Sequence, residues 1–368
     1  MKGVVVIGAG KIGATVAELL ASTGDYQVTL ADRSPEVLGN LDRDERIRIM
    51  AADAEDSLKL LDLLNGQFAI INAAPFRLTK HIAEAARAAG THYLDLTEDV
   101  VSTRRVKELA ANAETAFIPQ CGLAPGFVSI VAFDMANGFE VLDSVRLRVG
   151  ALPQYPSNAI NYNLTWSTDG VINEYCEACE AIVNGVRREV PPLEEREEFS
   201  LDGVTYEAFN TSGGVGTLCD TLQGKVRTLN YRTIRYPGHA TIMRALLNDL
   251  RLRDRRNVLK DILEHAVPTT LQDVVIIFVT VSGHKQETYA NKIYSRDVDG
   301  RTLSAIQITT AAAICTVVDL LATGQLPQSG FIRQEDIPLK VFLENRFGDV
   351  YAKPETSVRH QRFGGSGR

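Results

Sequence analysis

The sequence lacks the features that mark several classes of protein. Its 368 residues carry a formal net charge of −7, with lysine and arginine spread among acids, so no broad positive surface for nucleic acid is expected. The longest apolar runs, such as 274–281 and 311–318, are far shorter than the roughly 20 residues that span a bilayer. A strand pattern directly after Met1 leaves no room for a signal peptide. We therefore expect a cytoplasmic protein with neither a nucleic-acid nor a membrane partner.

Cysteine is also scarce. Five widely dispersed cysteines are an odd number, which argues against a disulfide framework. Cys176 and Cys179 form a C-x-x-C, but no second pair or neighbouring histidine completes a zinc site. The surrounding stretch 174–183, EYCEACEAIV, has the pattern of a helix. No metal site is expected.

The composition is that of a globular protein, with 45% hydrophobic and 23% charged residues. The length exceeds what one hydrophobic core usually supports, so two domains are expected. The first 120 residues alternate short β-branched runs with helical patterns, which is typical of an α/β doubly wound parallel sheet. Strands are expected at 4–7, 27–31, 47–50, 69–72, 92–96 and 116–119, helices at 12–22, 56–64, 79–89 and 102–112, and an irregular link at 34–45.

The pattern changes after residue 120. A turn-rich CGLAPG, a short apolar helix at 127–136 and longer alternating strands such as 141–149 and 274–281 predict a second, α+β domain. Segments 153–170 and 187–216 are rich in Pro, Asn, Ser, Gly and charge. They are expected to be long loops on a substrate-facing or inter-domain surface.

A glycine motif, G-x-G-x-x-G, spans residues 8–13, directly after a hydrophobic strand and before an amphipathic helix. The first glycine permits a tight turn, the second lets the backbone approach a pyrophosphate, and the third lets helix and strand pack closely. The helix N-terminus offers N–H groups and partial positive charge to the phosphates. A Rossmann dinucleotide site is therefore predicted. The residues expected to contact the cofactor here are Gly8, Ala9, Gly10, Lys11, Ile12 and Gly13.

Acidic and small residues at later strand ends extend this site. Asp32 ends the second strand, where an acid can bond the adenosine ribose hydroxyls. Because an acid there repels a 2′-phosphate, NAD is favoured over NADP, although Arg33 could bind that phosphate and NADP stays open. Asp53 could meet the adenine or could cap the following helix. The further cofactor residues expected at strand ends are Asp53, Ala54, Asn72, Ala73, Ala74 and Pro75.

Several widely spaced segments, in the same order, resemble lysine 6-dehydrogenase within the wider saccharopine dehydrogenase group. They are VVVIGAGKIG, HYLDLTED, IPQCGLAPGF, GVINEY, NGVRREVPPL, FNTSGG and RTIRYPGHATIM, and the likeness runs to about residue 345. It implies hydride transfer between NAD(P) and a carbon bearing an amine, a dimer contact in the second domain, and an inter-domain substrate cleft. Two positions depart from the pattern: Glu98-Asp99 replaces the Gly-His of the lysine enzymes, and Ala124 replaces the Asp of saccharopine reductases.

The expected division of the chain follows from the patterns and the resemblance together. It comprises a Rossmann NAD-binding domain at 1–122, an α+β substrate and dimerisation domain at 123–303, a C-terminal helical segment at 304–345 that returns to the first domain, and a flexible tail at 346–368. A homodimer or a higher homo-oligomer is expected.

Oxidising an amine needs a group that accepts a proton near neutral pH. Asp95 ends a predicted strand and matches an acid of the family motif, so it could bind or deprotonate the amine, or cap the next helix. Glu98 is the alternative base. His239 could shuttle protons, or it could be a structural histidine.

Arg235 could hold a substrate carboxylate through a two-pronged contact, or it could form an inter-domain salt bridge. The turn at 122–126 lies at the domain junction, where it could bring backbone close to the substrate or act as a hinge. The residues expected to contact an amino-acid substrate are Arg235, Tyr236, Gly122, Leu123 and Pro125.

The leading interpretation is NAD-dependent oxidative deamination, which gives an aldehyde or cyclic imine and ammonia. One alternative is a saccharopine-type reaction that joins an amino acid to a keto acid. A second alternative, of a different class, is an NAD-binding sensor without catalytic activity.

Overall fold

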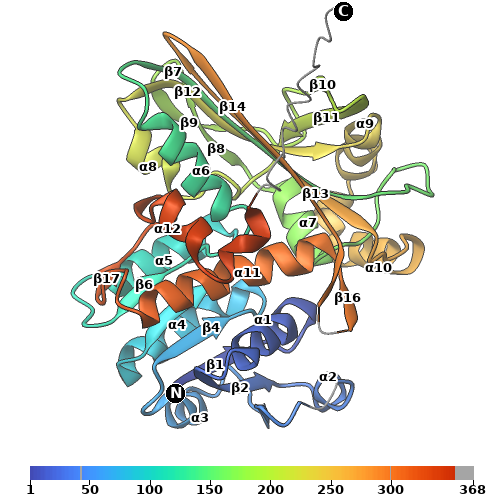
Figure 1. The fold of residues 1–368 in the computed structure, drawn as a ribbon. Helices are drawn as coiled ribbons and strands as arrows, with labels where there is room; N and C mark the ends of the chain where they lie inside the picture. Colours follow the sequence, from blue (N-terminus) through green and yellow to red (C-terminus); the bar gives the residue numbers. More distant parts are fainter. Residues whose placement is uncertain (42–43, 299, 353–368) are drawn as a thin grey trace, which may run out of the picture.

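The computed structural model describes residues 1–41, 44–298 and 300–352, which form two facing sheets with a long helix between them (Figure 1). The first sheet has seven strands in the order β17-β6-β5-β4-β1-β2-β3, all in parallel pairs. The strands are β1 Lys2–Ile7, β2 Tyr26–Asp32, β3 Ile47–Ala51, β4 Ala69–Asn72, β5 His92–Asp95, β6 Ala116–Ile118 and β17 Gly330–Phe331. The predicted α/β doubly wound sheet is confirmed.

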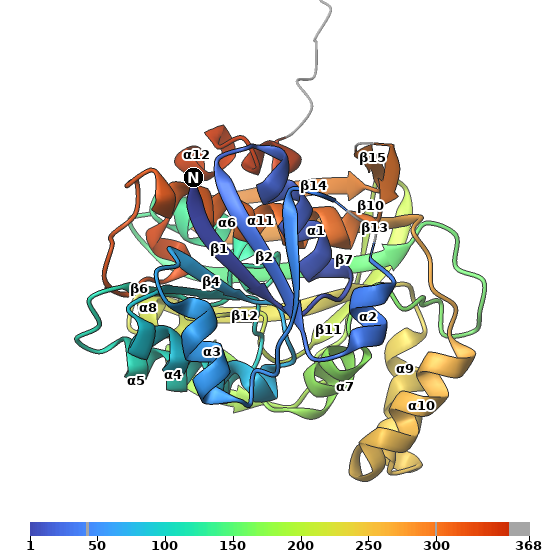
Figure 2. The ribbon, with the colours of Figure 1, turned by 90° about the horizontal axis from the view of Figure 1, so that it is seen from below.

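Alternate side chains of β1 enter two different cores, because successive residues of a strand point to opposite faces. Val4 and Val6 pack with helices α1 and α11, whereas Val5 and Ile7 pack with α3, α4 and α5. Figure 2 shows these two layers on opposite faces of the sheet. The helices of this domain are α1 Lys11–Ser22, α2 Pro35–Gly39, α3 Ser57–Leu64, α4 Thr79–Ala89 and α5 Val100–Ala110.

The second sheet has eight strands, six of them in the order β10-β11-β12-β7-β13-β14, with β8 beside β12 and β9 beside β8. These strands are β7 Leu142–Pro153, β8 Cys179–Val183, β9 Val186–Val190, β10 Glu197–Leu201, β11 Val204–Asn210, β12 Val226–Arg235, β13 Asp273–Gly283 and β14 Gln286–Tyr294. Its helices are α6 Phe127–Ala136, α7 Thr168–Cys176, α8 Leu218–Leu222, α9 His239–Arg244 and α10 Arg256–Ala266, and a small sheet adds β15 Arg296–Val298 and β16 Arg301–Leu303.

Two sequence expectations for this domain are wrong. Segment 187–216 contains β10, β11 and most of β9 rather than only loops, and segment 174–183 is helical only as far as Cys176, after which β8 begins at Cys179. The charged residues of β9 and β10 lie on half-exposed strands, where they do not prevent pairing. The link at 34–45 also contains the short helix α2.

Helix α11, Ala305–Ala322, joins the two domains. Its N-terminus is a capping box, in which Ser304 accepts from the backbone of Gln307 and Gln307 bonds back to Ser304. Its length and apolar composition would also suit a membrane span, but most of it is buried in the protein. It packs on α1 of the first domain and on β13 of the second, so both sheets share one hydrophobic core.

The C-terminal part packs onto the molecule further than expected. After α12, Leu339–Glu344, Arg346 forms ion pairs with Asp25 and Asp319, each at 2.6 Å. The hydroxyl of the fully buried Tyr351 donates to the Thr309 carbonyl at 2.7 Å. The expected flexible tail therefore does not begin at 346, because Phe347 and Tyr351 are buried in the core. Residues 353–368 lie outside the described part of the chain.

Candidate active site between the domains

The glycine loop fits a dinucleotide. Gly8 has φ +101°, and a Cβ added to it would lie 2.7 Å from the carbonyl of Ala73; one added to Gly13 would lie 1.8 Å from the Gly8 oxygen. A Cβ added to Gly10 would meet nothing within 4 Å. Two of the glycines therefore allow close packing, while Gly10 leaves open space at the N-terminus of α1. No side chain caps that helix end, so its N–H groups suit a pyrophosphate.

Asp32 is held rigidly beside this loop. Its carboxylate accepts from the backbone N–H of Ala9 at 2.9 Å and from that of Ser34 at 2.9 Å. Arg33 is exposed next to it. Asp53 is also exposed and accepts from the N–H of Glu55, while helix α3 is capped by Asp56 rather than by Asp53. Cofactor contacts by Lys11, Arg33, Asp53 and Ala54 stay predictions.

A cavity of about 280 Å³ opens where the glycine loop meets the second domain. It brings together residues that the sequence assigned to the cofactor and to the substrate. From the first domain and the junction it is lined by Ile12, Asn72, Ala73, Ala74, Pro75, Glu98, Gly122, Leu123 and Pro125, and from the second by Trp166, Asp169, Glu174, Tyr231 and Arg235. Asn72 shapes this wall, because its amide oxygen accepts from Ala74 N–H at 3.0 Å.

The guanidinium of Arg235 is buried and is held by two hydrogen bonds within the protein. Its Nε donates to the Tyr175 hydroxyl at 3.0 Å, and its Nη1 donates to the carbonyl of Ile234 at 2.8 Å. Within the described chain, Nη2 has no protein partner. This nitrogen is the donor that Arg235 can present to a ligand.

His239 supports Tyr175 and does not reach the cavity. Its Nδ1 lies 2.8 Å from the Ile160 carbonyl, so that nitrogen carries the proton and Nε2 accepts from the Tyr175 hydroxyl at 3.0 Å. Burial, and then the charge of Arg235, lower the pKa of His239 to about 3. The expected proton shuttle is therefore revised to a neutral histidine that orients Tyr175 and, through it, Arg235.

Asp95 and Tyr236 also depart from expectation. The Asp95 carboxylate is fully buried and accepts from Tyr93 Oη and from the N–H groups of Thr97 and Gln120. Burial raises its pKa to about 6, but in the described chain Asp95 does not line the cavity. Its hydrogen bond from Gln120 connects the end of β5 to the segment that follows β6. We therefore assign Asp95 this structural role and not that of the base. Tyr236 points to the opposite face from Arg235, and its hydroxyl donates to the Pro153 carbonyl at 2.9 Å.

Two glutamates share the cavity with Arg235. Burial raises the pKa of Glu98 to about 7, and the nearby charges of Asp99 and Asp95 act in the same direction. Burial raises the pKa of Glu174 to about 8, with a further rise from Glu98 and an opposing effect from Arg235. Sequence reasoning missed Glu174 and Tyr231. An acid beside the apolar residues of GVINEY was the available signal for Glu174, which is buried on α7.

A dinucleotide loop that opens into a cavity with titratable groups defines this chain as a two-domain oxidoreductase that binds NAD(P). Residues 4–118 match the saccharopine dehydrogenase NADP binding domain, and residues 122–346 match the saccharopine dehydrogenase C-terminal domain. The chain belongs to the saccharopine dehydrogenase family, which confirms the resemblance seen in the sequence at that level.

Individual relatives are more distant. The mouse and rat mitochondrial alpha-aminoadipic semialdehyde synthases are 22% and 21% identical over 191 and 193 residues, which is 50% of this chain but 21% of each relative. The yeast saccharopine dehydrogenase (L-Glu forming) superposes with a TM-score of 0.76 at 16% identity, over 93% of this chain and 97% of that one. The homospermidine synthase of Legionella pneumophila, in complex with NAD, gives 0.68 at 13% identity, over 95% and 89%. These structural likenesses concern the fold.

The raised pKa of Glu174 predicts a pH-dependent stability. The unfolded glutamate has its ordinary pKa of 4.5 and the folded one a pKa of about 8, so its favourable contribution is complete below pH 4.5 and is lost as the pH rises to about 8. We therefore compare the free energy of unfolding of the Glu174→Gln variant with that of the native protein at each pH. This difference should be more favourable to the variant at pH 8.5 than at pH 5, by about 1–3 kcal/mol. Denaturant unfolding at both pH values measures this difference.

The exposed Glu114, changed to Gln, is the matched control. It should keep the native difference in free energy of unfolding between the two pH values. If Glu174→Gln also keeps the native difference, Glu174 does not carry a proton in the folded protein.

Proposed function

We propose that this protein is an NAD(P)-dependent dehydrogenase that oxidises an amino-acid substrate at a carbon bearing an amine. The observation that carries the proposal is one cavity lined by Arg235, Glu98 and Glu174 together with Ile12 and residues 72–75 of the predicted cofactor site. When bound, NAD(P) supplies the hydride acceptor. The protein's own groups then have to hold the substrate at both ends and remove a proton from its amine.

Arg235 is suited to bind the substrate carboxylate. A buried guanidinium is costly unless it is paired, and among the described residues its hydrogen bonds and ring contacts are with neutral groups: the Tyr175 hydroxyl, a backbone carbonyl and the ring of Tyr162, whose centroid lies 5.0 Å from Cζ. A carboxylate at Nη2 would supply the missing charge partner through a charge-assisted hydrogen bond.

Glu98 is suited to the proton transfer. A base works best when its pKa lies near the working pH, and that of Glu98 is about 7. Glu98 takes over the role first predicted for Asp95, because Glu98 lines the cavity and, in the described chain, Asp95 does not. The deprotonated amine can then release hydride, and hydrolysis of the resulting imine liberates ammonia.

The charges of the cavity favour a lysine 6-dehydrogenase-like reaction. In the described chain Glu98 and Glu174 line it together with one cation, Arg235, while the third acid, Asp169, is already paired with Lys260 at 2.6 Å. This balance suits a substrate with two amino groups and one carboxylate, whereas saccharopine carries carboxylates at both ends. A saccharopine-type reaction is the second candidate, supported by the names of the family models and of the yeast neighbour.

We also propose a preference for NAD, which rests on the carboxylate of Asp32 at the end of β2. Absorbance of reduced nicotinamide, followed with NAD or NADP and with lysine, ornithine, diamines or saccharopine, tests both proposals. We expect turnover of a diamino acid with NAD and without a keto acid. Turnover of saccharopine alone, or reductive coupling that requires 2-oxoglutarate, would instead establish the second candidate. Cofactor binding without any turnover would favour a sensor.

Arg235→Lys tests the carboxylate contact. Lysine keeps the charge but cannot bond Tyr175 and a ligand in one plane, so we expect KM for the active amino acid to rise about 10- to 100-fold while the affinity for NAD is kept. Arg232→Lys is the control on the same strand, where Arg232 pairs with Glu195 and Glu197. Equal KM values for both variants would remove Arg235 from the substrate site.

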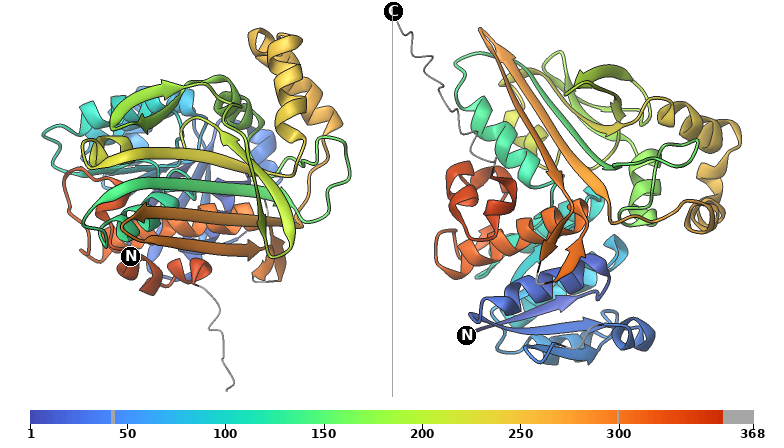
Figure 3. Two further views of the ribbon diagram at one scale, coloured as in Figure 1. Left: turned by 90° about the horizontal axis from the view of Figure 1, so that it is seen from above. Right: turned by 45° about the vertical axis from the view of Figure 1, so that its right-hand side comes forward.

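We further propose a homodimer formed through the outer face of the second sheet, which lies in front in the left view of Figure 3. Half-buried aromatic side chains lie on this face: Phe199 stacks on Phe278 with centroids 5.2 Å apart, and Arg148 covers Phe278. Such a face suits a closed two-fold interface. Sedimentation should give twice the chain mass of 40.3 kDa, and a single species of chain mass at micromolar concentration would contradict the dimer.

A further inference from the structure

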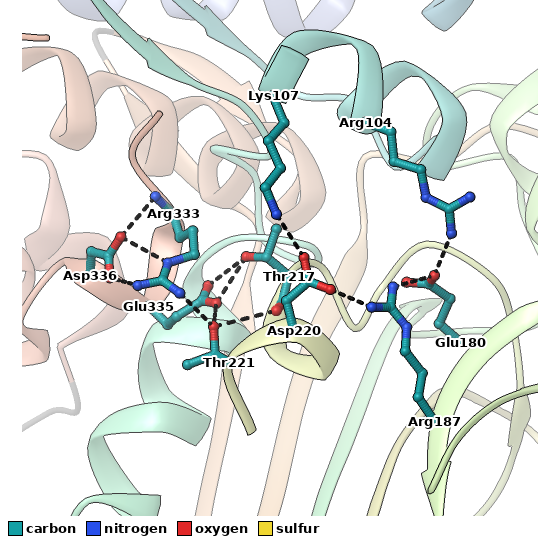
Figure 4. A network of polar contacts seen from close by, with 10 residues as sticks. All are labelled: Arg104, Lys107, Glu180, Arg187, Thr217, Asp220, Thr221, Arg333, Glu335 and Asp336. Atoms are coloured by element: carbon teal, nitrogen blue, oxygen red, sulfur yellow. Dashed lines mark hydrogen bonds and ion pairs between the residues drawn. The ribbon is translucent and has the colours of Figure 1, made fainter. Parts of the chain in front are cut away.

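A network of ion pairs crosses the domain boundary away from the cavity just described (Figure 4). Arg104 and Lys107 lie on α5 of the first domain. Arg104 Nη2 lies 2.9 Å from Glu180 Oε1, and Lys107 Nζ lies 3.1 Å from Asp220 Oδ2. Arg187 of β9 pairs with both of these acids, and its Nη2 lies 2.6 Å from Glu180. Each acid is therefore held by one cation from each domain.

The covalent chain links this network to the two glutamates of the active-site cavity. Glu98 directly precedes Asp99, the N-cap of α5, so the helix that carries Arg104 begins at the active site. Glu174 lies on α7, and Glu180 follows six residues later on β8. Each of the two glutamates therefore lies six residues along the chain from a member of the network, Glu98 from Arg104 and Glu174 from Glu180.

A glycine loop at 211–217 forms a second link. The N–H of Ser212 donates to the Glu174 carbonyl at 3.0 Å. Gly213, at φ +83°, packs so closely on Glu98 that an added Cβ would lie 2.4 Å from the backbone carbonyl oxygen of Glu98. The loop ends at Thr217, whose hydroxyl donates to Glu335 at 2.8 Å, and Asp220 follows in α8. One loop thus touches the backbone of both glutamates and leads directly into the network.

We propose that Arg104, Lys107, Glu180, Arg187 and Asp220 form a positioning device that sets the separation of Glu98 and Glu174 across the domain boundary. The proposal deepens the proposed function, because the two carboxyls are the groups that would receive the substrate's amines. Its members do not line the active-site cavity in the described chain, so they act on the site through the segments that they hold.

Loosening the network has a defined electrostatic consequence. If the domains part, water reaches the two glutamates and their mutual repulsion falls, so the pKa of each should move down toward its ordinary value. In the described chain the charged and titratable groups around them are Asp95, Asp99 and Arg235, together with Tyr162, Tyr175, Tyr231 and Cys179, and Asp169 lines the same cavity. The side chains of Arg104 and Lys107 are 60% and 54% exposed, so concentrated salt should screen their pairs.

The test is a double variant, Arg104→Gln with Lys107→Gln, in the full chain with saturating NAD. Infrared spectroscopy follows the titration of the two carboxyls, which are assigned from the Glu98→Gln and Glu174→Gln variants. We expect their titration to move down by about half a pH unit or more, and the pH dependence of kcat/KM to move with it. Molar salt should shift the native protein in the same direction and leave the double variant unchanged.

The matched control is Arg105→Gln, because Arg105 lies on the same helix but pairs with Glu84 and Glu108 of its own domain. It should titrate like the native protein, and the conservative pair Arg104→Lys with Lys107→Arg, which keeps both charges, should titrate close to the native protein as well. A native titration in the double variant, or an equal shift in the control, would overturn the positioning role. The infrared readout needs no substrate, so it decides this role even if the proposed amine oxidation fails.

Discussion

The buried guanidinium of Arg235 is the constraint on which the rest of the site depends. A charge in the protein interior is tolerated only when its surroundings are arranged for it, and a chain of neutral groups provides this arrangement here. The Ile160 carbonyl fixes the proton of His239, His239 orients the hydroxyl of Tyr175, and Tyr175 accepts from the guanidinium. In the described chain these hydrogen bonds leave Nη2 of Arg235, a residue that lines the cavity, without a protein partner. A structural requirement and a binding function therefore coincide in one side chain.

The shared core explains how this charge meets the cofactor loop. Helix α11 packs on both sheets, so the two domains share one core. The cavity lies between these two domains. On one side Ile12 of the glycine loop and residues 72–75 after β4 line the cavity, and on the other β12 ends at Arg235. Glu98 and Glu174 approach from the two domains, and the ion pairs around Glu180 and Asp220 close the same boundary from a second side.

Periodicity and glycine chemistry made much of the fold predictable. The continuous β-branched runs, the G-x-G-x-x-G and the acid at Asp32 depend on local rules, and the parallel sheet followed from them. The hairpins at 184–185 and 202–203 were missed, although Asn-Gly and Asp-Gly pairs with positive φ are the usual signal for such turns. The roles of Asp95 and His239 were misjudged because strand ends and turns show where a residue lies, but not which neighbours use its lone pairs. The acid in GVINEY was a signal for Glu174, but its place beside Glu98 depends on the packing of two domains, which local patterns do not show.

The most direct measurement is a crystal structure with NAD and a diamino acid bound together. It should show the substrate carboxylate within hydrogen-bonding distance of Arg235 Nη2, one amine beside Glu98, and the amine-bearing carbon facing the nicotinamide. A carboxylate bound elsewhere, with Arg235 still contacting only Tyr175 and the Ile234 carbonyl, would contradict the assignment of this cavity as the site of amine oxidation.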